Sequence, residues 1–197
     1  MGTRTKASET PARSGAEAGG ELVAVVAVYV VRHAHAQPRE GWTGRDEDRP
    51  LTDRGVKEAR ALADRFDTTA PGTRSRKSFA QAREPRPTLL LSSSAERCLA
   101  TLGPLAAACG LSVGTAEFLS EGSDARDALV QAQELAAGGG VPVLCTHGDV
   151  IWGMVELLEK SGAYLPGPVD VKKGSVWVLE VESGLIGSAR YIPPGRV

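Results

Sequence analysis

Histidine is scarce in this chain, and its three histidines follow the ends of two apolar segments. His33 and His35 come directly after residues 22–31, and His147 follows residues 141–146. Both segments have the length and composition of buried β-strands, and catalytic groups in open α/β sheets collect at the carboxyl ends of strands. If these two strands are neighbours, His33 and His147 face one crevice from opposite walls.

Two arginines close to these histidines predict an anion site. Arg32 precedes His33, and a permanently charged guanidinium at a buried strand end requires an anion or a carboxylate partner. The residues Ser93-Ser94-Ala95-Glu96 have the pattern of a capping box, so Arg97 falls in the first turn of a helix, where the helix dipole disfavours a cation. Helix starts also present backbone N–H groups, and together these donors suit a phosphoryl group.

This combination of groups favours phosphoryl transfer through a covalent intermediate. A neutral imidazole is nucleophilic near neutral pH, and a second basic group stabilises the equatorial oxygens of the phosphoryl group. The leaving oxygen needs a proton, and Glu121 supplies it if an apolar wall keeps its carboxyl group protonated. Asp149 and Glu117 are weaker candidates for the same role.

The elements that must position these residues alternate along the chain from residue 22. This alternation predicts a three-layer α/β/α sandwich with a mostly parallel central sheet. We expect strands over residues 22–31, 88–92, 111–115 and 141–146, and a hairpin of 175–181 and 185–192. We expect helices that are capped by Thr52 or Asp53, by the Ser93 capping box, by Ser123 and by Asp149.

Composition and charge describe one ordinary soluble domain. The chain has 197 residues, 42% of them hydrophobic, and a formal net charge of −1, which excludes a generally basic nucleic-acid binder. We expect residues 1–20 to form a disordered tail and residues 21–197 to form a single domain. Within this domain, residues 67–87 are predicted to be a basic flexible insertion. Three cysteines without a CxxC pair fit a reducing compartment, so we predict a cytoplasmic location.

The apolar segment 22–31 resembles a signal peptide because Ala34-His35-Ala36 follows it like a cleavage site. Three acids in the preceding residues, however, spoil the positive region that such a peptide needs, and six of the ten residues are valine, which favours a strand. Ten residues are also too few to cross a bilayer, which takes about 20 in a helix. We therefore expect no membrane partner.

Several motifs, in this order along the chain, resemble the histidine phosphatase superfamily, which includes phosphoglycerate mutases and the SixA-type phosphohistidine phosphatases. They are Val30-Val31-Arg32-His33-Ala34, Ser93-Ser94-Ala95-Glu96-Arg97-Cys98, Glu121-Gly122 and Cys145-Thr146-His147-Gly148-Asp149. The stretch 49–55 is similar to the SixA-like branch. The resemblance covers residues 22–192 except the insertion, and it extends to the phosphatase domain that follows some actinobacterial MutT-type Nudix domains.

The resemblance implies a role for each of these residues. It implies that His33 is the nucleophile, that Arg32, Arg97 and His147 bind phosphate, and that Glu121 donates the proton and later activates water. It implies a metal-independent phosphohydrolase without a cofactor. The substrate classes that remain open are a phosphorylated small molecule such as a phosphomonoester, a nucleotide, and a phosphoprotein such as a phosphohistidine protein.

Two positions depart from the family pattern. The usual Arg-His-Gly is Arg32-His33-Ala34 here, which resembles the SixA-like branch. Mutases commonly carry an asparagine six residues after the nucleophile, whereas this chain has Arg39 there and no asparagine at all. This difference argues against a phosphoglycerate mutase and makes Arg39 a candidate for an additional anion ligand.

Two rival functions remain open at this stage. The His33-Ala34-His35 spacing is also that of a metal-dependent hydrolase, since it places two imidazoles on one side of a strand. A module that binds phosphorylated ligands with little turnover is the other alternative, and it gains support if Glu121 points away from the site. We otherwise interpret His35 as structural, and we place Trp42 and Trp152 at the mouth of the crevice.

Overall fold

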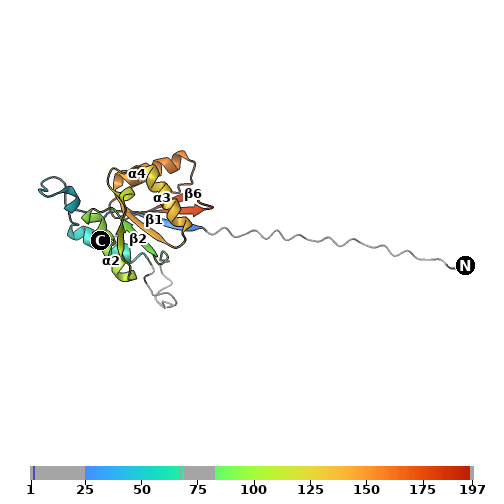
Figure 1. Cartoon of the computed structure of the whole chain (residues 1–197), viewed down its shortest axis with the longest axis horizontal. Coiled ribbons are helices and arrows are strands. Elements are labelled where there is room, and N and C mark those ends of the chain that lie inside the picture. Colours follow the sequence, from blue (N-terminus) through green and yellow to red (C-terminus); the bar gives the residue numbers. More distant parts are fainter. Residues whose placement is uncertain (1, 3–24, 67, 69–82, 196–197) are drawn as a thin grey trace.

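The computed structural model describes residues 2, 25–66, 68 and 83–195 of the chain (Figure 1). The predicted disordered tail, apart from Gly2, and most of the predicted insertion lie outside these residues. The end of the insertion is described, and there the Glu84 carboxylate accepts hydrogen bonds from Tyr29 Oη at 2.8 Å and from Arg190 Nη2 at 3.0 Å. This part of the segment therefore packs against the domain.

The described residues form a six-stranded sheet in the order β3-β2-β4-β1-β5-β6. The strands are β1 (Val26–Arg32), β2 (Leu89–Ser92), β3 (Val113–Thr115), β4 (Pro142–Thr146), β5 (Val176–Glu182) and β6 (Leu185–Ile192). All pairs between β1 and β4, β4 and β2, and β2 and β3 are parallel, and β5 runs opposite to both of its neighbours. The sheet is therefore mostly parallel, as the sequence predicts, and the predicted hairpin is confirmed.

Helices cover both faces of this sheet. They are α1 (Asp53–Ala63), α2 (Glu96–Cys109), α3 (Ala125–Ala137) and α4 (Gly148–Lys160), with short 3₁₀ turns η1 (Asp46–Asp48) and η2 (Glu117–Leu119). Alternate residues of β1 point to opposite faces. Val28 and Val30 pack with α3 and α4, whereas Tyr29 and Val31 pack with α1 and α2. Two hydrophobic cores thus separate three layers, which confirms the predicted α/β/α sandwich (Figure 1).

Parallel pairing of β1 with β4 brings the two predicted histidine positions together. Arg32 lies opposite Thr146 in the register, and the His33 backbone N–H donates to the Thr146 carbonyl at 3.0 Å. The residues that follow both strands therefore leave the sheet at the same edge. The next strand joins them there, because the Ser93 N–H donates to the Cys145 carbonyl at 2.9 Å.

The helix starts differ from the sequence prediction in three of four cases. Thr52 caps α1 as predicted, since its Oγ1 accepts from the Gly55 N–H at 3.2 Å. The predicted capping box of α2 is wrong, because Ala95 is the N-cap and Ser93 Oγ contacts His147 instead. Asp124, one residue after Ser123, caps α3, and His147, two residues before Asp149, is the N-cap of α4. At α2 and α4, polar groups near the helix start contact residues of the site instead of capping the helix.

No helix among the described residues is both long and apolar enough to cross a lipid bilayer. The segment 22–31, which resembles a signal peptide in sequence, ends in the buried strand β1, whose described residues begin at Val26. The strand interpretation of this segment is confirmed for those residues.

Two glycines allow a direct test of the close contact between α1 and the loop that follows β1. A Cβ at Gly55 would lie 2.0 Å from the His35 carbonyl oxygen, so we expect Gly55→Ala to lower the free energy of unfolding by about 2 kcal/mol or more. Gly103 in α2 has no atom within 4 Å of a built Cβ, so Gly103→Ala should raise stability by up to about 1 kcal/mol. Urea denaturation of both variants measures this difference, and equal effects would contradict the described contact.

Candidate active site

His33 is a buried imidazole that remains neutral at physiological pH. Its side chain follows β1 and is 6% exposed. Nδ1 lies 2.8 Å from the Ala34 carbonyl oxygen, and because a carbonyl only accepts, Nδ1 carries the proton. Burial, with smaller effects from Arg97 and Arg32, lowers the pKa of His33 to about 3. The lone pair on Nε2 is therefore free to act as a nucleophile.

His147 lies next to His33, as the strand-end argument predicts. The two ring centroids are 5.4 Å apart with an interplanar angle of 62°. His147 Nε2 lies 2.9 Å from Ser93 Oγ and 3.5 Å from Cys98 Sγ, so residues that follow β2 hold this ring. Three strand ends thus contribute to one pair of imidazoles.

Arg97 places a buried positive charge beside these rings. Its side chain is 2% exposed, and Nη2 lies 2.8 Å from Glu121 Oε2, 3.2 Å from Asp46 Oδ2 and 3.4 Å from His147 Nδ1. Nη1 donates to the Asp46 carbonyl oxygen at 2.8 Å. Arg97 therefore joins the α2 start, the loop after β1 and the loop before α3, and its charge is balanced by two carboxylates.

Arg32 supplies a second guanidinium on the other side of the site. Its Nη1 donates to the Val171 carbonyl oxygen, and its guanidinium packs against Gly148 at the start of α4, where a Cβ would lie 2.8 Å from Arg32 Cζ. Burial lowers the pKa of Arg32, while the carboxylates of Asp149 and Asp170 oppose this effect. Within the described residues, the buried Nε atoms of Arg32 and Arg97 have no hydrogen-bond partner.

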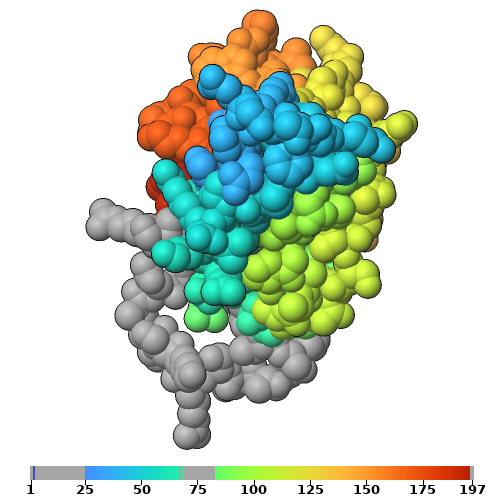
Figure 2. Space-filling view, turned by 90° about the vertical axis from the view of Figure 1, so that its left-hand side faces the viewer, coloured from blue at the N-terminus to red at the C-terminus, as the bar shows by residue number. Residues whose placement is uncertain are grey.

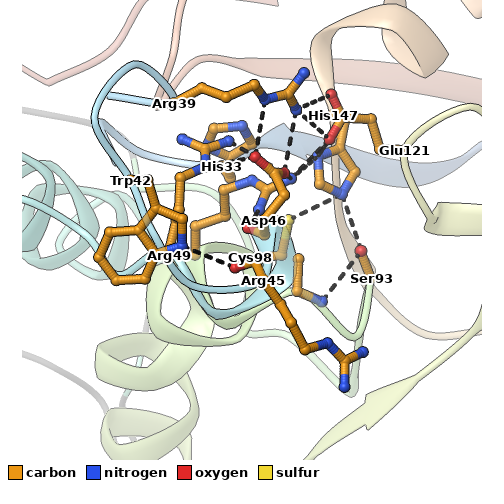
Figure 3. A network of polar contacts seen from close by, with 12 residues as sticks. His33, Arg39, Trp42, Arg45, Asp46, Arg49, Ser93, Cys98, Glu121 and His147 are labelled. Atoms are coloured by element: carbon orange, nitrogen blue, oxygen red, sulfur yellow. Dashed lines mark hydrogen bonds and ion pairs between the residues drawn. The ribbon is translucent and has the colours of Figure 1, made fainter. Parts of the chain in front are cut away.

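Glu121 points into the site, but its surroundings differ from the sequence expectation. Its carboxylate is 43% exposed and meets Arg97 on one side. On the other side Arg39 Nη2 lies 3.0 Å and 3.1 Å from its two oxygens (Figure 3). The predicted apolar wall is wrong, because two guanidinium groups surround this carboxylate. Arg39 itself is mostly exposed and also donates from Nε to Asp46 Oδ1 at 2.8 Å.

Asp46 is a central residue of the site that sequence reasoning missed. Its carboxylate meets Arg39, Arg49 and Arg97, and hydrogen bonding from Arg49 is the largest effect that lowers its pKa far below the usual range. Asp46 lies in the polar run of η1, which has no periodic pattern. The one signal in the sequence is that several acids alternate with arginines between residues 39 and 49.

Asp149 holds the loop that carries Glu121. Its Oδ2 accepts from the Gly122 backbone N–H at 2.7 Å, which ties the Glu121-Gly122 peptide to the first turn of α4. Glu117, the other weaker candidate, has an exposed side chain on η2 and does not line the cleft described next. Among the three candidate acids, Glu121 is therefore the one whose carboxylate contacts Arg97 and lines the cleft.

A cleft of about 570 Å³ opens over these residues. Its lining includes Arg97, Glu121, His147 and Trp42. His33 does not line the cleft itself but packs against His147, which does. Trp42 therefore lies where the sequence places it, whereas Trp152 is 45% exposed on α4, bonds to Glu156, and is not part of the lining.

The imidazoles of the HxH motif have different partners. His35 Nδ1 lies 2.9 Å from Thr52 Oγ1, whereas His33 packs against His147. The His35 backbone N–H also donates to the buried carboxylate of Glu58 at 2.8 Å. The described residues contain no group of three His, Cys, Asp or Glu side chains that would hold a metal ion. The contacts of His35 are those of a residue that positions the loop after β1.

Comparisons with known proteins agree with this site. The sequence profile of the histidine phosphatase superfamily (branch 1) matches residues 28–125. The 8-oxo-(d)GTP phosphatase of Mycolicibacterium smegmatis is 32% identical over 170 residues, which are 85% of this chain and 48% of that protein. The chain thus spans about half the length of this curated relative.

Solved structures share the fold. The protein histidine phosphatase SixA in complex with tungstate has a TM-score of 0.60 at 18% identity, over 85% of this chain and 95% of SixA. A SixA structure from Nakamurella multipartitia has a TM-score of 0.59 at 22% identity, over 88% of this chain and 96% of that one. The chain belongs to the histidine phosphatase superfamily. Its fold is that of the SixA-like members.

The buried neutral state of His33 predicts a pH dependence of stability. In the unfolded chain His33 takes up a proton near its ordinary pKa of 6.5, whereas in the folded protein it does so only near pH 3. The unfolded state therefore binds more protons between these values, and stability falls as the pH falls through this window. We expect His33 to contribute a slope of about 1 kcal/mol per pH unit between pH 5 and 6.

The variant His33→Asn keeps a donor near the position of Nδ1 and removes the titrating group. Urea denaturation of wild type and variant at pH 5, 6 and 7 isolates the effect, because other titrating groups are common to both proteins. The variant should lose less stability between pH 6 and pH 5. Parallel curves would mean that His33 is not held neutral in the folded state.

Proposed function

We propose that this protein is a phosphatase that works through a phosphohistidine intermediate on His33, without a metal or another cofactor. The observation that carries the proposal is the neutral, buried His33, packed against His147 and close to the buried guanidinium of Arg97 and the half-buried guanidinium of Arg32. A neutral imidazole beside cations combines a nucleophile with groups that stabilise phosphoryl oxygens.

Arg32, Arg97 and His147 bind the phosphoryl group in this proposal. Buried guanidinium donors without partners are uncommon, and the unpaired Nε atoms of Arg32 and Arg97 suit the oxygens of an anion. A phosphoryl group that reaches His33 competes with Glu121 for Arg97. The SixA structure in complex with tungstate, an oxyanion shaped like phosphate, supports this use of the fold.

The reaction proceeds in two displacements. His33 Nε2 attacks phosphorus, the bond from phosphorus to the leaving oxygen breaks, and that oxygen takes the electron pair and a proton from Glu121. Glu121 then removes a proton from water, the water oxygen attacks phosphorus, and the N–P bond breaks to return the electron pair to Nε2. Glu121 donates a proton in the first displacement and accepts one in the second, so it ends the cycle as it began.

The position of Glu121 argues against a module that only binds phosphorylated ligands. Such a module is favoured if Glu121 points away from the site, whereas its carboxylate lies 2.8 Å from Arg97 Nη2 and lines the cleft. Arg39, which contacts both Glu121 and Asp46, serves as an additional ligand for substrate anions.

The proposed substrate is a phosphorylated small molecule, a nucleotide or a phosphoprotein. The relative from Mycolicibacterium smegmatis acts on 8-oxo-(d)GTP, which supports the nucleotide class. A panel of phosphomonoesters, nucleotides and phosphohistidine peptides, assayed with wild type and with a His33 variant, separates these classes.

The nucleophile is tested by His33→Ala with 4-nitrophenyl phosphate as substrate. We expect turnover to fall at least 10³-fold, about the scale of losing a covalent catalytic group. Rapid quenching of wild type with a ³²P-labelled phosphomonoester should trap an acid-labile phosphoryl group that is absent from the variant. Full activity of the variant would overturn the mechanism.

The same assay distinguishes the rival functions. Activity that disappears with a chelator and returns with zinc or manganese would support a metal-dependent hydrolase. A phosphoenzyme that forms but never hydrolyses would support the binding module.

The proton donor is tested by Glu121→Gln and two substrates that differ in their leaving groups. The phenol of phenyl phosphate needs a proton in order to leave, whereas 4-nitrophenolate does not. We expect the rate of phosphoenzyme formation to fall about 100-fold or more with phenyl phosphate and less than about 10-fold with 4-nitrophenyl phosphate. Single-turnover quenching measures this step alone. Glu117→Gln is the matched control and should behave as wild type, and equal losses for the two substrates would show that Glu121 is not the donor.

A further inference from the structure

The cleft is larger than a phosphoryl group requires, and one aromatic side chain forms part of its wall. Its volume of about 570 Å³ lies within the range of pockets that hold whole small molecules. The phosphate-binding side chains Arg97 and His147 lie at one part of the lining, and the half-buried Trp42 lies at another. A substrate whose phosphoryl group lies beside His147 therefore has room to place its leaving group along the lining that includes Trp42.

The indole of Trp42 is fixed in place by its own loop. Its Nε1–H donates to the Arg45 carbonyl oxygen at 2.9 Å, so the polar atom of the ring is already satisfied. Gly44 lies against the same ring, since a Cβ there would come within 3.1 Å of Nε1 and 3.2 Å of Cε2. What the ring offers to the cleft is thus an apolar aromatic surface in a defined orientation.

The same loop connects this ring to the phosphate-binding residues. The 3₁₀ turn η1 follows Arg45 directly, and its first residue, Asp46, accepts from Arg97 Nη1 through its carbonyl oxygen at 2.8 Å. Figure 2 shows the segment that connects β1 to α1, in blue, beside the residues of α2, in green. The position of Trp42 relative to Arg97 is therefore set by two consecutive residues. Arg45 accepts a hydrogen bond from Trp42, and Asp46 accepts one from Arg97.

We propose that Trp42 is the platform on which the base of a nucleoside phosphate stacks while its phosphoryl group lies at His33. This inference rests on the proposed function and names a substrate class for the same site. Aromatic rings stack on a flat base through dispersion and electrostatic attraction, and this contact does not require hydrogen bonds to particular atoms of the base. Ser94 and Ser120, which also line the cleft, offer hydroxyl groups to the heteroatoms of a base.

The remaining lining groups favour a base over an acidic peptide. Asp46, Glu47 and Glu121 place three carboxylates along the cleft, against Arg39 and Arg97. Additional carboxylates on a ligand would be repelled by these acids, whereas an uncharged heterocycle is not. A nucleoside phosphate concentrates its charge at the phosphoryl end, where the guanidinium groups lie, and presents a neutral ring to Trp42.

The test compares guanosine 5′-monophosphate with ribose 5-phosphate, which has the same phosphoryl and sugar groups but no base. Calorimetric titration in a His33→Asn background avoids turnover. We expect the nucleotide to bind at least 10-fold more tightly than the sugar phosphate. Trp42→Ala should remove about 10-fold of the affinity for the nucleotide and change that for ribose 5-phosphate less than 2-fold. Trp42→Phe should retain most of the preference.

Trp152→Ala is the matched control, because Trp152 is an exposed tryptophan outside the cleft. It should leave both affinities unchanged. Equal losses for both ligands in Trp42→Ala would show that Trp42 only supports the loop, and they would overturn the platform. The platform would also be overturned if wild-type affinity for the nucleotide were no higher than that for ribose 5-phosphate. A higher affinity for a phosphotyrosine peptide than for the nucleotide would overturn it as well.

The two proposals fail in different ways. If wild type hydrolyses phosphomonoesters but shows no preference that depends on Trp42, the platform is wrong and the proposed function stands. If wild type hydrolyses no phosphomonoester, nucleotide or phosphohistidine peptide of the panel while the Trp42-dependent preference persists, the platform stands and the proposed function is wrong.

Discussion

The parallel pairing of β1 with β4 is the constraint on which the site depends. The register that puts Arg32 opposite Thr146 fixes where both strands end, and the hydrogen bond from the His33 N–H to the Thr146 carbonyl extends the pairing by one residue. A slip of one residue would turn every side chain of β1 to the opposite face of the sheet. The two hydrophobic cores prevent such a slip, because they bury both faces of β1. Two imidazoles more than a hundred positions apart in the sequence are thus held in contact by the cores.

Charge balance is the second constraint. The site buries Arg97 and half-buries Arg32, and their charges require anions nearby. Glu121 and Asp46 provide carboxylates for Arg97, and Arg39 and Arg49 in turn neutralise these carboxylates. Arg97 and the carboxylates around it are consequently paired with each other before substrate arrives. In the proposed mechanism a phosphoryl group enters by exchange, since it takes over donors of Arg97 that these carboxylates hold.

Much of this arrangement follows from the sequence. The periodic and apolar segments predict the strands, the sheet type and the layers, and the strand ends predict the meeting of His33 with His147. Helix caps are harder to predict, because the hydroxyl of Ser93 satisfies His147 and the carboxylate of Asp149 satisfies Gly122, both through contacts between distant parts of the chain. Asp46 was missed for the same reason. Its partners come from its own loop and from α2, and no local pattern encodes them.

Thr101 joins the backbone beside His33 to the helix that carries Arg97 through a single hydroxyl group. Its Oγ1 donates to the Arg97 carbonyl oxygen at 2.6 Å and accepts from the Ala34 N–H at 2.9 Å. The backbone next to His33 is therefore anchored on the helix that carries Arg97, whereas Trp42 belongs to the surface loop beyond. Evolution can rebuild that loop for another leaving group while the reacting atoms keep their places, which helps to explain how one scaffold serves enzymes with unrelated substrates.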